Sequence, residues 1–111
     1  MTEHKTVELF LSCASWQEAQ RIVDQLLKKQ LIACAEFIPI KSKVAWHHKH
    51  DEADEVKLIM FSLADYFKKV EAEVRKLHSH NTFTLKAVPV EYLSKPAITW
   101  LQELTAVELL E

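Results

Sequence analysis

Glycine is absent from the 111 residues of the sequence, although average usage of about 7% would give roughly eight. P-loops, dinucleotide-binding fingerprints and the nucleophile elbows of hydrolases all need glycine where the backbone turns sharply or approaches a ligand. The sequence therefore excludes these classes of site. Tight turns must instead use residues such as Asn81, Asp51, Ser42 and Ser79, whose side chains can hydrogen-bond to nearby backbone.

Cysteine is also scarce, neither charge is in large excess, and no apolar run is long enough to span a bilayer. Cys13 and Cys34 lie in apolar strand patterns rather than in a C-x-x-C motif, which predicts a reduced, buried pair with structural roles. A net charge of −2 gives no reason to expect a nucleic-acid partner. Because residues 1–6 contain no apolar signal-peptide core, we expect a cytoplasmic protein that does not bind membranes.

The length and the 49% apolar content fit a single domain, residues 1–111, and a domain this small often gains stability by oligomerising. Alternating apolar residues at 7–13 predict a first strand. Phe10 makes the second face of this strand partly apolar as well. This pattern indicates a central strand that helices cover on one side. Ser15 and Glu18 have the spacing of a capping box, and the apolar residues that follow at helical spacing predict a helix ending at Lys28 and Lys29.

The middle of the chain contains two strand-type runs, residues 32–48 and 55–61, on either side of the charged segment 49–54. This pattern predicts a β-hairpin with a polar turn. The first run is much longer than an average strand of roughly 5–6 residues, so we expect it to project from its domain as an arm, at an edge and bent near Pro39.

The sequence pattern of the last part of the chain predicts two helices and a strand. Ser62 or Asp65 is expected to cap a helix that ends around His78, residues 83–90 form a strand, and Pro96 lies at the start of a last helix. That helix carries the apolar residues Ile98, Trp100, Leu101 and Leu104.

The predicted order of elements, β-α-β-β-α-β plus a C-terminal helix, is that of an α+β fold of the ferredoxin-like split-βαβ type. Helices cover only one face of such a sheet, so the other face needs an apolar cover. A bare face and a long arm together predict strand pairing between subunits in a closed ring.

Sequence pieces along nearly the whole chain, from about Val7 to Leu104, resemble the CutA divalent-cation-tolerance family. The most specific is the L-x-A-C element at residues 31–34, in register with Pro39 and Trp46. The other pieces are Ile38, Glu55-Val56, His78, residues 87–90 (AVPV), Tyr92-Leu93 and Trp100-Leu101. The resemblance implies a homotrimer of ferredoxin-like subunits whose hairpins pair across subunit boundaries, a cytoplasmic or organellar location, and a link to copper and other divalent ions.

Two motifs of the family are altered. Where the family has Trp or Tyr and then Trp-Glu-Gly-Lys at the end of the arm, residues 45–50 read AWHHKH. Where it has H-P-Y-E-x-P, residues 78–83 read HSHNTF and keep only the first histidine. The fold elements of the family are thus present, whereas the polar residues of its cleft are replaced.

Histidines are the strongest candidates for metal ligands. Two H-x-H pairs, His48/His50 and His78/His80, could each present two imidazoles on one face of a strand to a divalent metal, copper or zinc, and His47 adjoins the first pair. The predicted ligands are His47, His48, His50 and His78. The alternative for the first group is a solvated polar turn, and for His78 a favourable position at the C-terminus of a helix.

No enzyme is predicted, because the neighbours of Cys34 supply no charge that would activate its thiol. Trp46, at the end of the arm, is assigned to a subunit interface. The sequence therefore predicts a non-enzymatic homotrimer that binds a divalent metal. The alternative is a regulatory sensor, similar in architecture to PII signalling proteins, that binds a small molecule or a protein partner in the clefts between subunits.

Overall fold

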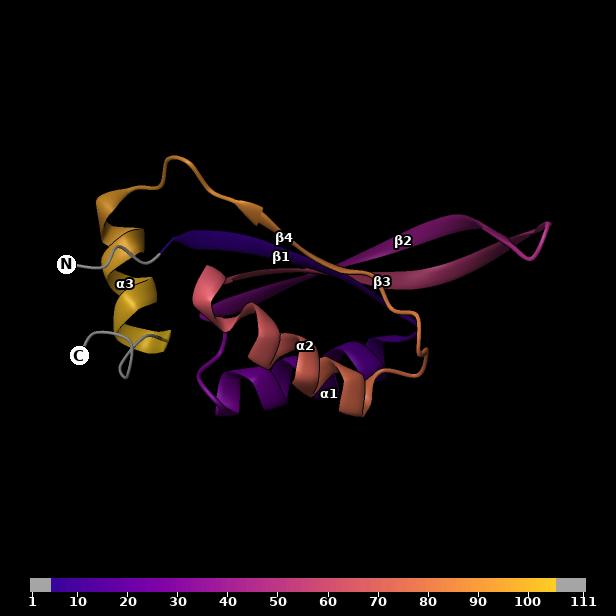
Figure 1. Ribbon diagram of the computed structural model, residues 1–111, viewed down its shortest axis with the longest axis horizontal. Coiled ribbons are helices and arrows are strands. Elements are labelled where there is room, and N and C mark those ends of the chain that lie inside the picture. The colour runs from indigo at the N-terminus through magenta and orange to yellow at the C-terminus, as the bar shows by residue number, and fades with distance from the viewer. Residues whose placement is uncertain (1–4, 106–111) are drawn as a thin grey trace.

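The structure is a computed structural model that describes residues 5–105. Residues 1–4, on which part of the signal-peptide prediction depends, and the side chain of Leu104 lie outside the described part. The molecule is elongated, with a longest dimension of 50 Å, because a two-stranded arm projects from one end of the sheet (Figure 1). No helix within residues 5–105 is both long and apolar enough to cross a membrane.

The sheet has four antiparallel strands within residues 5–105, in the order β2-β3-β1-β4. They are β1 (Thr6–Cys13), β2 (Cys34–Trp46), β3 (Lys49–Leu63) and β4 (Leu85–Pro89). β1 lies between β3 and β4, which confirms the prediction of a central strand. β2 lies at one edge, which is the position that Pro39 predicts because proline lacks an amide donor.

Two helices pack against one face of the sheet: α1 (Trp16–Lys28) and α2 (Phe67–Leu77). The last helix, α3 (Lys95–Thr105), lies at the end of the sheet opposite the arm (Figure 1). A short 3-10 turn, η1 (Ala64–Tyr66), precedes α2. The elements therefore follow one another in the predicted order, with η1 added.

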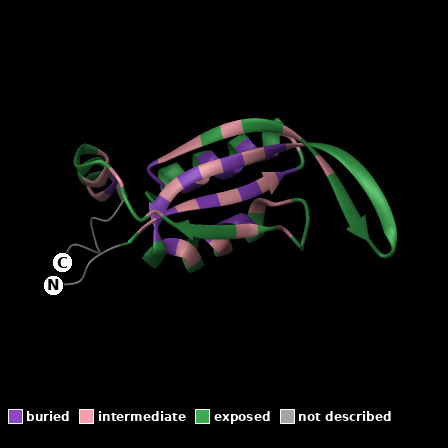
Figure 2. Cartoon of the chain, turned by 90° about the horizontal axis from the view of Figure 1, so that it is seen from above, coloured by how far each residue is buried: buried purple, intermediate pink, exposed green. Residues whose placement is uncertain are grey.

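The hydrophobic core fills the space between the helices and the sheet (Figure 2). Strict alternation along β1 turns every second residue toward the helices, and these residues are buried. Their cross-strand partners on β3 lie on the same face, as Leu9 with Met60 and Leu11 with Leu58 show. The helices contribute the buried residues Ala19, Ile22, Val23, Leu26, Val70 and Val74.

Among the described residues, 5–105, no helix covers the opposite face of the sheet (Figure 1). Phe10 lies near its centre, with the ammonium groups of Lys57 and Lys86 at 5.4 and 5.8 Å from the centre of its ring. Its cross-strand partner Ile59 and the nearby Phe61 are only partly buried. This surface, the bare face, therefore combines apolar side chains with lysines that cover part of them.

The arm consists of residues 40–46 of β2 and 49–55 of β3, which lie beyond the part of β3 that pairs with β1. The predicted polar turn at 49–54 is wrong, because these residues continue β3. The turn is instead the two residues His47 and His48, with φ values of 50° and 66°. Positive φ at both central residues is typical of the tight hairpin turns whose twist matches that of the strands.

The predicted N-cap residue is correct for α1 but not for α2. Ser15 caps α1 as predicted, because its hydroxyl accepts a hydrogen bond from the Glu18 N–H at 3.1 Å. Neither Ser62 nor Asp65 occupies the N-cap position of α2, which is Tyr66. The Ser62 hydroxyl lies in β3 and donates to the Leu31 carbonyl at 2.7 Å, while Asp65 lies within η1.

Gln30 follows α1 and has a φ of 59°, a left-handed conformation that favours glycine. Substitution of this residue therefore tests whether its backbone is strained. The hydrogen bonds from Gln30 N–H to the Leu27 carbonyl and from Leu31 N–H to the Leu26 carbonyl form a Schellman motif. Gln30→Gly should raise the free energy of unfolding by about 0.5–1 kcal/mol in urea denaturation. The control Gln20→Gly, inside α1, should lower it by about 1 kcal/mol. Destabilisation by both variants would contradict the assignment.

Candidate functional site

Three side chains with metal-ligating atoms converge where the end of β1, the first turn of α1 and the residue after α2 meet. They are Cys13, Glu18 and His78, and one such atom of each lies within 4.8 Å of the others. We call this group the buried triad. It is the one set of three or more such side chains that the described residues bring together.

Glu18 holds the buried triad to the backbone of two other segments. The residue is only 3% exposed, and its two carboxylate oxygens accept hydrogen bonds from the Ala14 N–H at 2.8 Å and the Ser79 N–H at 2.6 Å. The carboxylate of the predicted capping box therefore reaches Ala14 rather than Ser15. Its second oxygen ties the start of α1 to the segment that follows α2.

These contacts set the ionisation of Glu18. Burial raises the pKa of the carboxyl, but the hydrogen bonds from Ser79 and Ala14 outweigh it, so the pKa lies below its ordinary value. The carboxylate is therefore charged at neutral pH, where it accepts both backbone N–H groups.

His78 has both ring nitrogens engaged. Nε2 lies 2.8 Å from the Ser12 carbonyl oxygen, which can only accept, so Nε2 carries the proton and donates. Nδ1 accepts a hydrogen bond from the His80 N–H at 3.1 Å. The side chain is only 2% exposed, and Nε2 also lies 3.7 Å from a carboxylate oxygen of Glu18. The contacts therefore define one neutral tautomer of His78.

Cys13 completes the buried triad as a protonated thiol. Burial, with smaller contributions from the charges of Glu18 and Glu55, raises the pKa of the Cys13 thiol to about 12. Since a thiolate is needed both for nucleophilic attack and for coordination, this cysteine is inert at neutral pH unless a metal displaces its proton. In the metal-free protein Glu18 and His78 of the buried triad act as a hydrogen-bonded clamp between β1, α1 and the segment after α2.

The remaining predicted metal ligands lie at the tip of the arm. His47 and His48 form its turn, and His50 is the second residue of β3; all three are exposed. Because His48 lies in the turn and only His50 lies in a strand, the two residues do not share one face of a strand as the sequence predicted. The structure brings His78 into the buried triad but does not bring the three tip histidines together with it. Metal binding by these four residues stays a prediction.

The sequence did not single out Cys13 or Glu18 as members of a common cluster. The capping-box spacing identified Glu18, yet the contact with Ser79 joins residues 61 positions apart and depends on the tertiary fold. The two cysteines also differ from expectation. Cys13 is buried, whereas Cys34 is only partly buried because it lies on the bare face, opposite Phe61. Both are free thiols.

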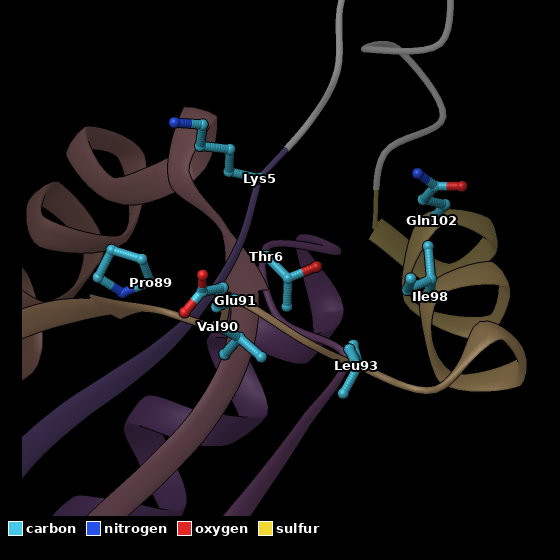
Figure 3. Close-up of a pocket in the computed structure, with 8 residues that line it drawn as sticks. All are labelled: Lys5, Thr6, Pro89, Val90, Glu91, Leu93, Ile98 and Gln102. Carbon is cyan, nitrogen blue, oxygen red and sulfur yellow. The ribbon is translucent and has the colours of Figure 1, made fainter.

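A pocket of about 630 Å³ lies between the end of the sheet and α3 (Figure 3). Thr6 and Val90 line it from the strand side, while Ile98 and Gln102 line it from α3. The other lining residues are Lys5, Pro89, Glu91 and Leu93. Its walls therefore offer apolar surface together with hydroxyl, amide, ammonium and carboxylate groups.

The fold and its long arm define a class of small α+β proteins with a four-stranded antiparallel sheet and helices on one face. The sequence profile described as CutA1 divalent ion tolerance protein matches residues 7–104. The chain thus belongs to the CutA family, which confirms the resemblance seen in the sequence.

Individual relatives agree with this assignment. The divalent-cation tolerance protein CutA of Archaeoglobus fulgidus is 35% identical over 95 residues, which cover 86% of this chain and 93% of that protein. The CutA of Pyrococcus horikoshii is 26% identical over 97 residues, covering 87% and 95% of the two chains. The solved structure of the A. fulgidus protein, described there as periplasmic, superimposes with a TM-score of 0.88 at 33% identity and covers 90% of this chain and 98% of that one.

The clamp function of Glu18 predicts a specific loss of stability. Glu18→Gln replaces one accepting oxygen by an NH2 group, which leaves the N–H of Ala14 or Ser79 unpaired and should cost about 1–3 kcal/mol in urea denaturation at pH 7. Glu71→Gln, which removes an exposed contact of 3.6 Å with Arg75, is the matched control and should change little.

The same variant tests the ionisation of the carboxyl. The folded-state pKa of Glu18 is lowered, so its contribution to stability is complete above the ordinary value of 4.5 and is lost as the pH falls through the lowered pKa. The stability of Glu18→Gln should therefore fall less steeply in this acidic range than that of the parent. Parallel pH profiles would contradict this assignment.

Proposed function

We propose that the chain is a non-enzymatic, homotrimeric member of its family, built of ferredoxin-like subunits, that binds a divalent metal ion such as copper or zinc. The observation that carries the metal proposal is the tip of the arm, where three exposed imidazoles, His47, His48 and His50, lie within four residues. Imidazole nitrogen suits copper and zinc, and exposed side chains can reach an ion without breaking core contacts.

His78 enters the proposal through the buried triad. A metal bound there has to displace the proton on Nε2 and the proton of the Cys13 thiol, whose pKa is raised to about 12. This requirement favours the tip as the first site to fill. It also supports a role without catalysis, because the thiol of the buried triad is not activated.

The trimer proposal is supported by the surfaces that a single chain leaves exposed. Val44 and Trp46, on the side of the arm continuous with the bare face, are 45% and 54% exposed. Large apolar side chains gathered on one extended surface are typical of protein interfaces. The cytoplasmic location is part of the same proposal, and cell fractionation tests it.

The second candidate function is a regulatory sensor similar to PII signalling proteins. The pocket beside α3 supports it, because its mixed lining suits a small molecule with both apolar and charged groups (Figure 3). Such a sensor would bind its ligand equally well with and without the tip histidines.

Titration calorimetry with Cu²⁺ and Zn²⁺, on untagged protein, tests the metal proposal. The parent should bind, and binding should weaken in acid because imidazole must lose its proton to coordinate. The variant His47→Ala/His48→Ala/His50→Ala should lose binding, while Cys13→Ala should keep it. Binding lost in Cys13→Ala alone would assign the metal to the buried triad, and no binding by the parent would favour the sensor.

Light scattering at micromolar concentration tests the trimer, since the mass should be three times the 12.9 kDa of one chain. Val44→Lys, on the bare-face side of the arm, should lower the trimer fraction. Ala45→Lys is the matched control, because neighbouring residues of a strand point to opposite faces. A folded monomeric parent would contradict the proposal.

A further inference from the structure

The two groups of histidines lie at different places in one chain. The tip histidines are at the far end of the arm, whereas the segment between α2 and β4, which contains His80, lies at the end of the sheet where the arm begins (Figure 1). About seven residues of β-strand, roughly 23 Å, separate the base of the arm from its tip. Within residues 5–105, no tip histidine belongs to a set of three or more metal-ligating side chains that lie close together.

The topology determines where the tip lies if copies of the chain pair edge to edge. Successive neighbours in the order β2-β3-β1-β4 are antiparallel, so the two edge strands, β2 and β4, run in opposite directions. A second copy in the same orientation therefore places its β4 antiparallel to β2 of the first. In this arrangement the C-terminal end of β2, at Trp46, lies next to the N-terminal end of β4, at Leu85.

We take β4 of the second copy to pair with the β2 half of the arm, and the lengths of these two segments then limit the possible registers. β4 has five residues, and the β2 half of the arm has seven, residues 40–46. Antiparallel pairing of β4 with this half sets Leu85 opposite residue 44, 45 or 46. By the same register His47 lies opposite residue 82, 83 or 84 of the second copy, and His48 lies opposite residue 81, 82 or 83.

His80 directly precedes this segment of the second copy and carries a suitable ligand atom. It is exposed, whereas the ring nitrogens of His78 already bond to Ser12 and to the His80 backbone. We infer that His47, His48 and His50 of one copy and His80 of the next together form an inter-subunit site for a divalent metal ion. This inference rests on the proposed trimer and names the residue that completes its metal site.

Imidazole ligands suit divalent ions of intermediate softness such as Zn²⁺ and Cu²⁺. Four imidazoles supply the number of ligands that Zn²⁺ takes in closed sites, and nitrogen ligands also suit Cu²⁺. Because the ligands come from two copies, the metal would link neighbouring subunits, and binding would stabilise the trimer by mass action.

Zn²⁺ calorimetry on untagged chains tests the inference. His80→Ala should abolish binding as fully as His47→Ala/His48→Ala/His50→Ala, while Asn81→Ala, the matched control on the same segment, should bind like the parent. Light scattering and circular dichroism check that each variant is folded and trimeric.

Subunit mixing then separates a site between chains from one within a chain. When the His80 variant and the tip variant are unfolded together and refolded in equal amounts, random assembly pairs an intact tip with an intact His80 at about a quarter of the junctions. Binding should return at about a quarter of the parent stoichiometry.

The other outcomes are decisive. Variants that fail singly and stay inactive when mixed, or a His80 variant that binds like the parent, overturn the inter-subunit site while leaving the trimer and the tip intact. A monomeric parent overturns both the inference and the proposed trimer.

Discussion

Hydrogen bonding along the open edges of the sheet is the constraint on which the account depends. Within residues 5–105, β2 pairs only with β3, and the arm extends past the last residue of β3 that pairs with β1. A long strand edge is a template for pairing with another chain, and proteins normally shorten, cover or pair such edges. Here the edge is thirteen residues long, so the chain has a physical reason to assemble with copies of itself.

The same constraint separates the two parts of the molecule that carry chemistry. The buried triad lies inside one chain, where Glu18 and His78 use their polar atoms to hold β1, α1 and the segment after α2 together. The tip histidines lie outside the core and, within residues 5–105, make no comparable hydrogen-bond network. A metal that binds at the buried triad must replace contacts that stabilise the fold, whereas a metal at the tip adds contacts to an exposed turn. This difference in free-energy cost is the reason that we propose the tip, rather than the buried triad, as the metal site.

Much of the fold could be predicted from local patterns. Alternation in β1, the capping serine of α1 and the helical spacing of both packed helices each depend on neighbours in sequence, and the structure confirms them. The hairpin turn was misplaced because no glycine or asparagine marks it and because charged residues such as Asp51 suggested a turn instead. The buried triad was missed for a different reason, since Cys13, Glu18 and His78 meet only through tertiary packing. Partial exposure of Cys34 likewise depends on which face of β2 the helices cover.

Amide hydrogen exchange, residue by residue, tests the central claim most directly. If β2 and β4 pair between copies, the amides that point outward from both edges should exchange slowly, including those of residues 40–46. If the edges are open in solution, these outward amides should exchange nearly as fast as an unstructured chain while β1 and the paired part of β3 stay protected. That second pattern would contradict the account of the arm and of the metal site at its tip.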